Sequence, residues 1–436
     1  MENAALAFLS HDWAGLCFSA LFLIAGGSSW RLGRGRHRKL RVAGALLLGI
    51  GSMMAAGATY HLVYMIGVRN EHPAPGKLVD IGGYRLHVLA EGKAHGKPAI
   101  VWMPGAHSAG FYFHHLHRAL RGETRSILVD RPGMGWSDIG PFPRTTPLEA
   151  EEVVEALRRA GERGPFILVG HSFGGLLVAN IARRHPDLAA AVVLLDATPP
   201  DAINYAPSNP FLRQMRVDAL LATVQRLFGI HSRTAERLWG RETALDAQRI
   251  ESLVEERIGK PLHDVRAIEE GARANAANFS IFAELAPGRL SWDAVVYDGE
   301  LGDVPVYLVA PQEMPELGGA SQRMMREEGE NSLQSRDMRR LQRFYARARE
   351  RYMAVSSRAQ RIVTPSGTGH NYPYEAPQFV VDALRQVLRD TPSRLDVAAF
   401  SAPPPATPAA TASPARSAPD SSPPPTGSAP YSRHPR

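Results

Sequence analysis

The chain has 436 residues, of which 44% are hydrophobic, and it carries a formal net charge of +7. This length allows one large domain or two ordinary ones, and the single cysteine excludes an intrachain disulfide. Six of the basic residues fall within 31–41, between two uncharged apolar runs. This clustering favours a membrane-linked cause for the positive charge over a nucleic-acid partner.

The two apolar runs cover residues 13–30 and 42–68. A helix of about 20 apolar residues spans the hydrocarbon core of a bilayer, so both runs qualify. The sequence therefore predicts two transmembrane helices within 13–68, packed through Gly51 and Ala55, with the basic loop 31–41 in the cytoplasm. This predicts a multi-pass protein of the cell inner membrane whose remaining chain faces the periplasm or the exterior. One buried helix plus a signal-like anchor is the alternative.

Residues 76–390 alternate short apolar strands with amphipathic helices, which predicts an α/β fold with a mostly parallel sheet. The alternation stops over about 199–302, where helical patterns follow one another, so we expect an inserted helical cap there. A helix after residue 145 is expected to begin with a capping box of Thr146 and Glu149. Residues 391–436 are rich in Pro, Ala and Ser and predict a disordered tail.

The stretch FILVGHSFGG, residues 166–175, places a serine between a predicted strand and a predicted helix. Gly170 and Gly174 stand two residues on either side of Ser172, in a G-x-S-x-G pattern. A strand-to-helix turn of this sharpness strains the serine backbone and lifts its hydroxyl above the sheet. The pattern predicts that Ser172 is a nucleophile.

A serine hydroxyl needs a base within hydrogen-bond reach and donors for the oxyanion that forms. His370 is the favoured base, because it lies on a Gly-rich loop between the last strand and the last helix; His171 is the rival. The backbone N–H groups of Phe173 and Ala106 are the expected oxyanion donors.

These residues resemble the α/β-hydrolase fold superfamily. The matching pieces are the elbow, the segment DRPGMGWSD at 130–138 and the segment around His370, and the resemblance covers roughly 76–390. It looks closest to membrane-anchored bacterial members of the esterase and lipase type. The elbow serine differs from the aspartate that similar dehalogenases and epoxide hydrolases use. Asp130, Arg131 and Asp138 are interpreted as a turn held together by charge.

The third member of the expected triad departs from the family pattern. Similar enzymes commonly place an Asp after the strand that corresponds to 303–311, where this chain has Pro311-Gln312-Glu313-Met314. Other members place the acid at the end of the preceding strand, where Asp196 stands. Asp196 is ranked first and Glu313 second. The acid holds the histidine tautomer and stabilises the imidazolium.

The sequence thus predicts a membrane-anchored serine hydrolase that cleaves a carboxylic ester through an acyl-enzyme, with a hydrophobic or lipid ester favoured. The lipid bilayer is the expected partner, with no nucleic acid, cofactor or metal. His114, His115 and His117 lie close together, but a helix explains them better than a metal site. The competing hypothesis is a catalytically inactive binding or scaffolding protein that kept the fold. Substrate identity and oligomeric state are left open.

Overall fold

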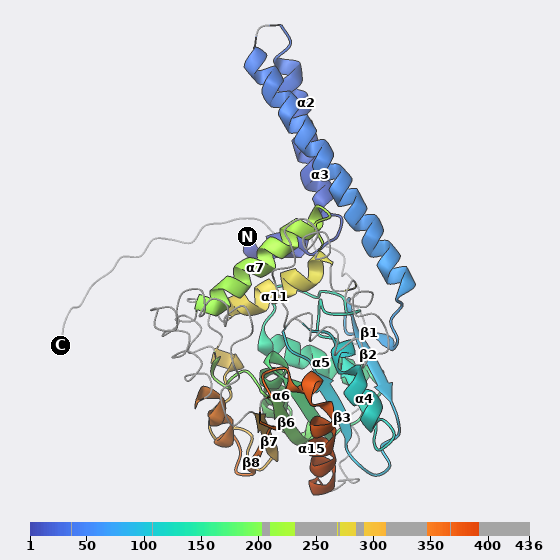
Figure 1. The fold of residues 1–436 in the computed structure, drawn as a ribbon, viewed down its shortest axis with the longest axis vertical. Coiled ribbons are helices and arrows are strands. Elements are labelled where there is room, and N and C mark those ends of the chain that lie inside the picture. The colour runs from blue at the N-terminus through green and yellow to red at the C-terminus, as the bar shows by residue number, and fades with distance from the viewer. Residues whose placement is uncertain are drawn as a thin grey trace, which may run out of the picture. The chain divides into compact units, whose positions relative to one another are not determined.

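The structure is a computed structural model, and it describes nine stretches of the chain (Figure 1). Two predictions fall outside the described residues: the second-ranked acid Glu313 and the tail after residue 391. Much of the expected cap also lies outside them. The described residues are 1–35, 37–106, 108–202, 210–231, 268, 271–284, 292–310, 347–366 and 368–391.

Within the described residues, eight strands form one sheet in the order β1-β2-β4-β3-β5-β6-β7-β8. Strands β3 to β8 run parallel, and β2 pairs antiparallel with both β1 and β4, which confirms the mostly parallel sheet. The strands are β1 Lys77–Asp80, β2 Arg85–Glu91, β3 Ala99–Met103, β4 Ser126–Val129, β5 Phe166–His171, β6 Ala189–Leu195, β7 Val306–Ala310 and β8 Ala359–Val363.

Helices cover the sheet because its central strands are apolar on both faces. β3, β4, β5 and β7 are buried along their whole length. Side chains alternate between the faces of a strand, so Ile100, Trp102 and Ile167 share one core cluster with the apolar residues of α4 and α15. The flanking helices are α4 His114–Leu120, α5 Thr146–Ala160, α6 Phe173–Arg184 and α15 Pro377–Asp390.

The start of α5 differs from the predicted capping box. Thr145, not Thr146, is the N-cap, and its side chain accepts a hydrogen bond from the N–H of Leu148. Glu149 therefore lies one position too far along the helix to complete the box. Its fully buried carboxylate pairs instead with Arg131 and Arg144, so ion pairing outweighed capping at this residue.

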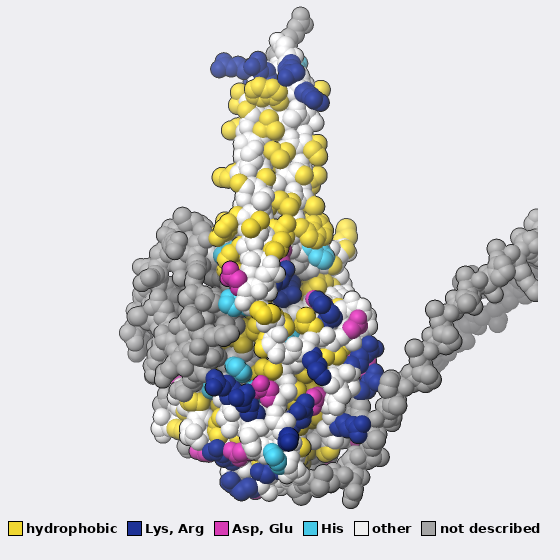
Figure 2. Space-filling view, turned by 90° about the vertical axis from the view of Figure 1, so that its right-hand side faces the viewer, with side chains coloured by type: hydrophobic (Ala, Val, Ile, Leu, Met, Phe, Trp, Pro, Cys, Tyr) yellow, Lys and Arg dark blue, Asp and Glu magenta, His cyan; other side chains and the backbone are white. Residues whose placement is uncertain are grey.

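Two helices near the N-terminus, α2 (Ala14–Leu32) and α3 (Arg38–Glu71), form a hairpin, preceded by a short helix α1 (Glu2–Leu9). Both α2 and α3 are long and apolar enough to cross a membrane by length and composition. Figure 2 shows apolar side chains around the hairpin and Lys and Arg side chains gathered at its end. The exposed apolar residues include Leu21, Ile24, Leu46, Ile50 and Met53.

Small residues bring the two helices of the hairpin into close contact. A Cβ at Gly26 would lie 2.8 Å from the backbone nitrogen of Leu48, and one at Gly44 would lie 2.6 Å from that of Trp30. The buried small residues of α3 are Gly44, Gly51 and Ala58, spaced by seven. The expectation for Gly51 holds, but Ala58 rather than Ala55 continues the seam.

The described part of the cap contains α7 (Pro210–Leu227), α11 (Ala272–Glu284) and the single turn Trp292–Ala294. The end of α7 docks on the hairpin. A Cβ at Gly15 of α2 would lie 2.1 Å from the carbonyl oxygen of Leu227, and one at Gly57 of α3 would lie 2.2 Å from that of Phe228. The cap and the hairpin are thus joined by backbone packed against backbone.

Replacing Gly26 by valine tests the hairpin seam. The branched side chain would meet the backbone of α3, so we expect G26V to destabilise the protein by about 1–3 kcal/mol, as overpacking usually does. The readout is a lower midpoint of thermal unfolding in detergent. Gly27→Val is the matched control, because a Cβ at Gly27 meets nothing within 4 Å. Equal midpoints for the two variants would contradict the seam.

Candidate active site

Ser172 occupies a strained turn between β5 and α6. Its backbone angles are φ +53° and ψ −123°, a region that residues with a side chain rarely adopt. The flanking glycines are required by contact rather than by their own dihedral angles. A Cβ at Gly170 would lie 2.2 Å from the carbonyl oxygen of Gly174, and one at Gly174 would lie 2.2 Å from that of Met103. Gly175, which sequence reasoning did not single out, is equally tight against Ala197, at 2.3 Å.

His370 lies on the loop between β8 and the short helix α14 (Tyr372–Glu375), and its ring contacts Asp196. The Nδ1 atom of His370 is 2.5 Å from Oδ2 of Asp196. A carboxylate only accepts, so Nδ1–H donates and Nε2 keeps its lone pair. Asp196 follows β6 and is 4% exposed, whereas the His370 side chain is 44% exposed. The structure thus brings the first-ranked acid to the expected base.

His171 connects the elbow to the histidine loop. Its Nε2–H donates a hydrogen bond of 2.9 Å to the backbone carbonyl oxygen of His370, and the two rings are 4.6 Å apart. Burial, and then the charge of His370, lowers the pKa of His171 to about 3, so this imidazole is neutral near pH 7. A neutral ring whose Nε2–H is bound to the backbone of His370 fits a positioning role better than that of the rival base.

No hydrogen bond joins Ser172 to His370 in the described part of the chain. Catalytic hydrogen bonds are often long without substrate and tighten only in the complex. The two residues nevertheless lie at the same edge of the sheet. His171, the residue before Ser172, donates a hydrogen bond to the backbone carbonyl of His370.

Arg131 holds the loop that carries the expected oxyanion donor Ala106. Its Nη2 donates to the carbonyl oxygens of Gly105 at 3.0 Å and Ala106 at 2.5 Å. The peptide bond between these two residues is trans, so the N–H of Ala106 points opposite to the carbonyl of Gly105, away from Arg131. The guanidinium also lies 5.0 Å from the Phe173 ring centroid. Arg131 therefore contacts both residues expected to supply oxyanion donors.

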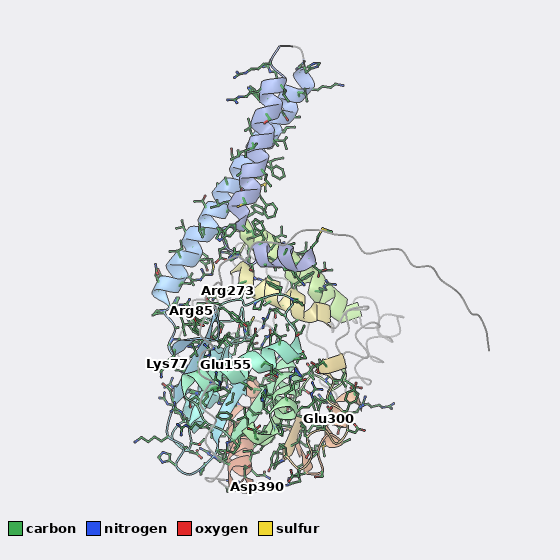
Figure 3. All side chains as sticks on the ribbon, turned by 180° about the vertical axis from the view of Figure 1, so that it is seen from behind. Lys77, Arg85, Glu155, Arg273, Glu300 and Asp390 are labelled. Atoms are coloured by element: carbon green, nitrogen blue, oxygen red, sulfur yellow. The ribbon has the colours of Figure 1, made fainter. Side chains whose placement is uncertain are left out.

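Asp130 and Asp138 hold the neighbouring turn together, as interpreted from the sequence. Asp130 accepts hydrogen bonds from the N–H groups of Gly110 at 2.6 Å and Trp136 at 3.1 Å. Asp138 pairs with Arg85, while Arg273 of α11 donates to the carbonyl of Gly135; both arginines are labelled in Figure 3. The turn is thereby tied to a cap helix, and of the three charged residues only Arg131 reaches the elbow.

Arg349 was missed by sequence reasoning. Its Nη1 donates to Oδ1 of Asp196, the carboxylate oxygen that His370 does not use. Arg349 is 7% exposed and lies in an arginine-rich segment. A run of arginines carries no sign of which one turns inward, so the sequence held no usable signal for this contact.

The described residues contain no group of three or more His, Cys, Asp or Glu side chains placed to hold a metal ion. Two of the three clustered histidines of α4 have other partners. The Nε2 atom of His117 is 2.9 Å from a Glu91 carboxylate oxygen, and that of His115 is 3.0 Å from the carbonyl oxygen of Pro373. The second contact tethers α14, the short helix that follows the loop carrying His370.

Curated relatives match parts of the chain. The protein YbdG of Bacillus subtilis is 28% identical over 152 residues, covering 34% of this chain and 46% of that protein. The 2-(acetamidomethylene)succinate hydrolase of Mesorhizobium japonicum is 35% identical over 124 residues, covering 28% and 42%. A 1-acylglycerol-3-phosphate O-acyltransferase of Arabidopsis thaliana is 34% identical over 105 residues, covering 23% and 25%. The chain spans less than half of the length of each of these relatives.

Solved structures similar to this chain include an esterase from Thermogutta terrifontis, with a TM-score of 0.47 and 20% identity over 71% of this chain and 94% of that one. An enol-lactonase from Burkholderia xenovorans has a TM-score of 0.46 and 18% identity over 72% and 100%. At this level of similarity neither solved structure defines the activity of the chain. The model of the alpha/beta hydrolase family matches residues 100–383, well over half of the sequence, and the chain belongs to that family.

Proposed function

We propose that the protein is a serine hydrolase that cleaves a carboxylic ester through an acyl-enzyme. The observation that carries the proposal is the 2.5 Å contact between His370 Nδ1 and Asp196 Oδ2 at the sheet edge where Ser172 stands. This contact leaves the lone pair of Nε2 available as a base, which is the arrangement a serine nucleophile needs. Membership in a hydrolase family supports the same reaction class.

The proposed reaction begins when Ser172 Oγ attacks the ester carbonyl and His370 Nε2 takes its proton. The N–H groups of Phe173 and Ala106 stabilise the oxyanion. The C–O bond to the alcohol then breaks, and the alcohol leaves with the proton from His370. A water molecule, deprotonated by His370, attacks the acyl-enzyme and releases the acid and Ser172. Asp196 remains ionised throughout and stabilises the imidazolium.

A hydrophobic acyl ester or lipid is the substrate class that we propose. The cap helix α7 exposes Val217, Leu221 and Val224, which share one helix face, and its end packs on the apolar hairpin. Among the relatives, the name of the Arabidopsis protein describes acyl transfer to an acylated glycerol phosphate. An apolar substrate held in a bilayer would concentrate next to such a cap.

We also propose that the hairpin spans the inner membrane and that the hydrolase domain lies on its outer face. The support is the length and apolar surface of α2 and α3 together with the exposed basic residues between them. Cytoplasmic loops are enriched in Lys and Arg, so the loop 31–41 is assigned to the cytoplasm. Both ends of the hairpin then emerge on the opposite side.

Labelling with a fluorophosphonate probe tests the enzyme proposal. We expect the wild-type protein to be labelled at Ser172, because the probe forms a stable bond only with an activated serine. Ser172→Ala should abolish labelling, and His370→Ala should slow it by about 10²–10⁴-fold through loss of the base. Ser357→Ala, at an exposed serine far along the chain, is the control and should label fully. A folded wild-type protein without labelling would favour the inactive scaffold.

Reporter fusions test the topology. Alkaline phosphatase fused after residue 72 should be active in intact cells, because it folds only outside the cytoplasm. A green fluorescent protein fused at the same place should be dark after export through the general secretion pathway. Fusion within the loop 31–41 should reverse both signals. Fluorescence after residue 72 together with an inactive phosphatase there would refute the outward placement.

The strained backbone of Ser172 leads to a third prediction. Glycine tolerates a positive φ, so Ser172→Gly should unfold at a higher temperature than Ser172→Ala, with a difference of about 1 kcal/mol. At an ordinary site alanine would be the more stable residue by a similar amount. Differential scanning calorimetry of both variants gives the comparison. An alanine variant that is equally or more stable would show that the turn is not strained.

A further inference from the structure

Arg349 and His370 bind the two oxygens of one carboxylate. Oδ2 of Asp196 is 2.5 Å from Nδ1 of His370, and Oδ1 accepts from Nη1 of Arg349. Asp196 and Arg349 are 4% and 7% exposed, so the ion pair lies almost out of water. The carboxylate is therefore shared between a permanent cation and a group that becomes a cation when it accepts the serine proton.

Stability alone gives no reason for this ion pair. Removing two charges from water costs several kcal/mol each, and replacing a buried pair by apolar residues is often neutral or stabilising. The Nε atom of Arg349 is buried and has no hydrogen-bond partner, so the guanidinium is not fully satisfied. A costly, incompletely paired arginine beside the expected acid points to a role in the chemistry.

We propose that Arg349 is a positioning residue that fixes the Asp196 carboxylate toward His370 and, through its charge, keeps His370 neutral under mildly acidic conditions. This inference rests on the proposed serine hydrolase function and adds its pH range. An imidazolium at position 370 would share Asp196 with the guanidinium, and the two cations would repel each other. The neutral imidazole is favoured for the same reason.

Other groups around His370 do not offset the charge of Arg349. His171 packs against the ring and is neutral, and Tyr372 is buried with its pKa raised well above 10 by that burial. Glu375 is held by the N–H of Gly369. Facing Arg349 itself are Glu350 and Arg361, which pair with each other. Among the described residues Asp196 is thus the anion in direct contact with His370.

The pKa of His370 agrees with the geometry. Burial and then the charge of Arg349 lower this pKa from its ordinary value of 6.5. The side chain is 44% exposed, so water still reaches the ring and weakens both contributions. A lowered pKa leaves the imidazole neutral, and so able to act as a base, at a pH where an ordinary histidine is protonated.

Tyr352 holds the segment of Arg349 in place. Its hydroxyl donates to the carbonyl oxygen of Thr198 at 2.8 Å, in the segment that follows β6, on which Asp196 lies. Arg351 is 40% exposed and pairs with a different aspartate, Asp201, so it offers a matched control in the same segment.

The test compares Arg349→Met, Arg349→Lys and the control Arg351→Met in full-length protein in detergent, with p-nitrophenyl butyrate as the substrate. We expect R349M to move the acid limb of the kcat/KM profile upward by about one pH unit, since a nearby charge shifts a pKa by one unit or more. Below the midpoint this is a loss of about tenfold. R349K should return the midpoint most of the way to its wild-type value, and R351M should leave the midpoint unchanged. A lower rate with an unmoved midpoint in R349M would overturn the proposal.

A second measurement does not depend on turnover. Diethyl pyrocarbonate modifies a histidine only when its imidazole is neutral. The pH dependence of modification at His370, followed by mass spectrometry of its peptide, therefore reports the protonation of this imidazole. We expect the midpoint to rise in R349M and not in R351M. If the wild type is inactive and is not labelled by the fluorophosphonate, but the midpoint still rises in R349M, the hydrolase function is refuted and the role of Arg349 is kept. An unchanged midpoint in an active protein would refute the role alone.

Discussion

The hydrogen-bonded register of four parallel strands is the constraint on which the candidate active site depends. Met103 of β3 pairs with Gly170 of β5, and Leu195 of β6 pairs with both His171 of β5 and Val309 of β7. The carboxyl ends of these strands are therefore level. The residues that follow them, Gly105 and Ala106, Ser172 and Asp196, meet without any long loop having to close. A slip of one residue would turn each of these side chains to the other face.

Buried ion pairs position the loop and helix residues that the strand register does not determine. Arg131 joins the loop after β3 to Glu149 of α5, and Arg144 contacts both Glu149 and Glu152. The hydrogen-bond network continues from Glu152 to the hydroxyl of Tyr84. The backbone N–H of Arg144 donates to the hydroxyl of Ser280 in the cap helix α11 at 2.7 Å. Burial raises the pKa of Glu152, while the hydrogen bond and the charge of Arg144 oppose that rise. Such a network is strongly directional, so it orients the oxyanion loop more narrowly than apolar packing would.

The sequence was informative where a local pattern has one physical meaning. The apolar run before Ser172 and the glycines around it allowed the elbow to be placed, because only that turn requires such residues in such close contact. The position of His370 followed from its loop between the last strand and the last helix. Pairing between long side chains was not predictable, since Arg349 and Arg351 look alike in sequence but differ in burial and in the aspartate that each reaches. The predicted capping box at Glu149 was wrong for a similar reason, because the sequence does not show that this carboxylate pairs with two buried arginines.

The junction of hairpin and cap connects the proposed membrane anchor to the chemistry. Asp12, before α2, accepts from His61 of α3, and His61 Nδ1 lies 2.8 Å from Nε2 of His231, just after α7. The Nε2–H of His61 donates to the carboxylate, and in the neutral ring Nδ1 then accepts from His231. Together with the backbone contacts at Gly15 and Gly57, this chain of buried hydrogen bonds leaves α7 little freedom to tilt relative to the hairpin. With the hairpin in a bilayer, α7 would be held at the membrane surface with Val217, Leu221 and Val224 exposed, while α11 reaches through Arg273 to the turn beside the elbow. The distance between lipid and nucleophile would then be set by the fold itself.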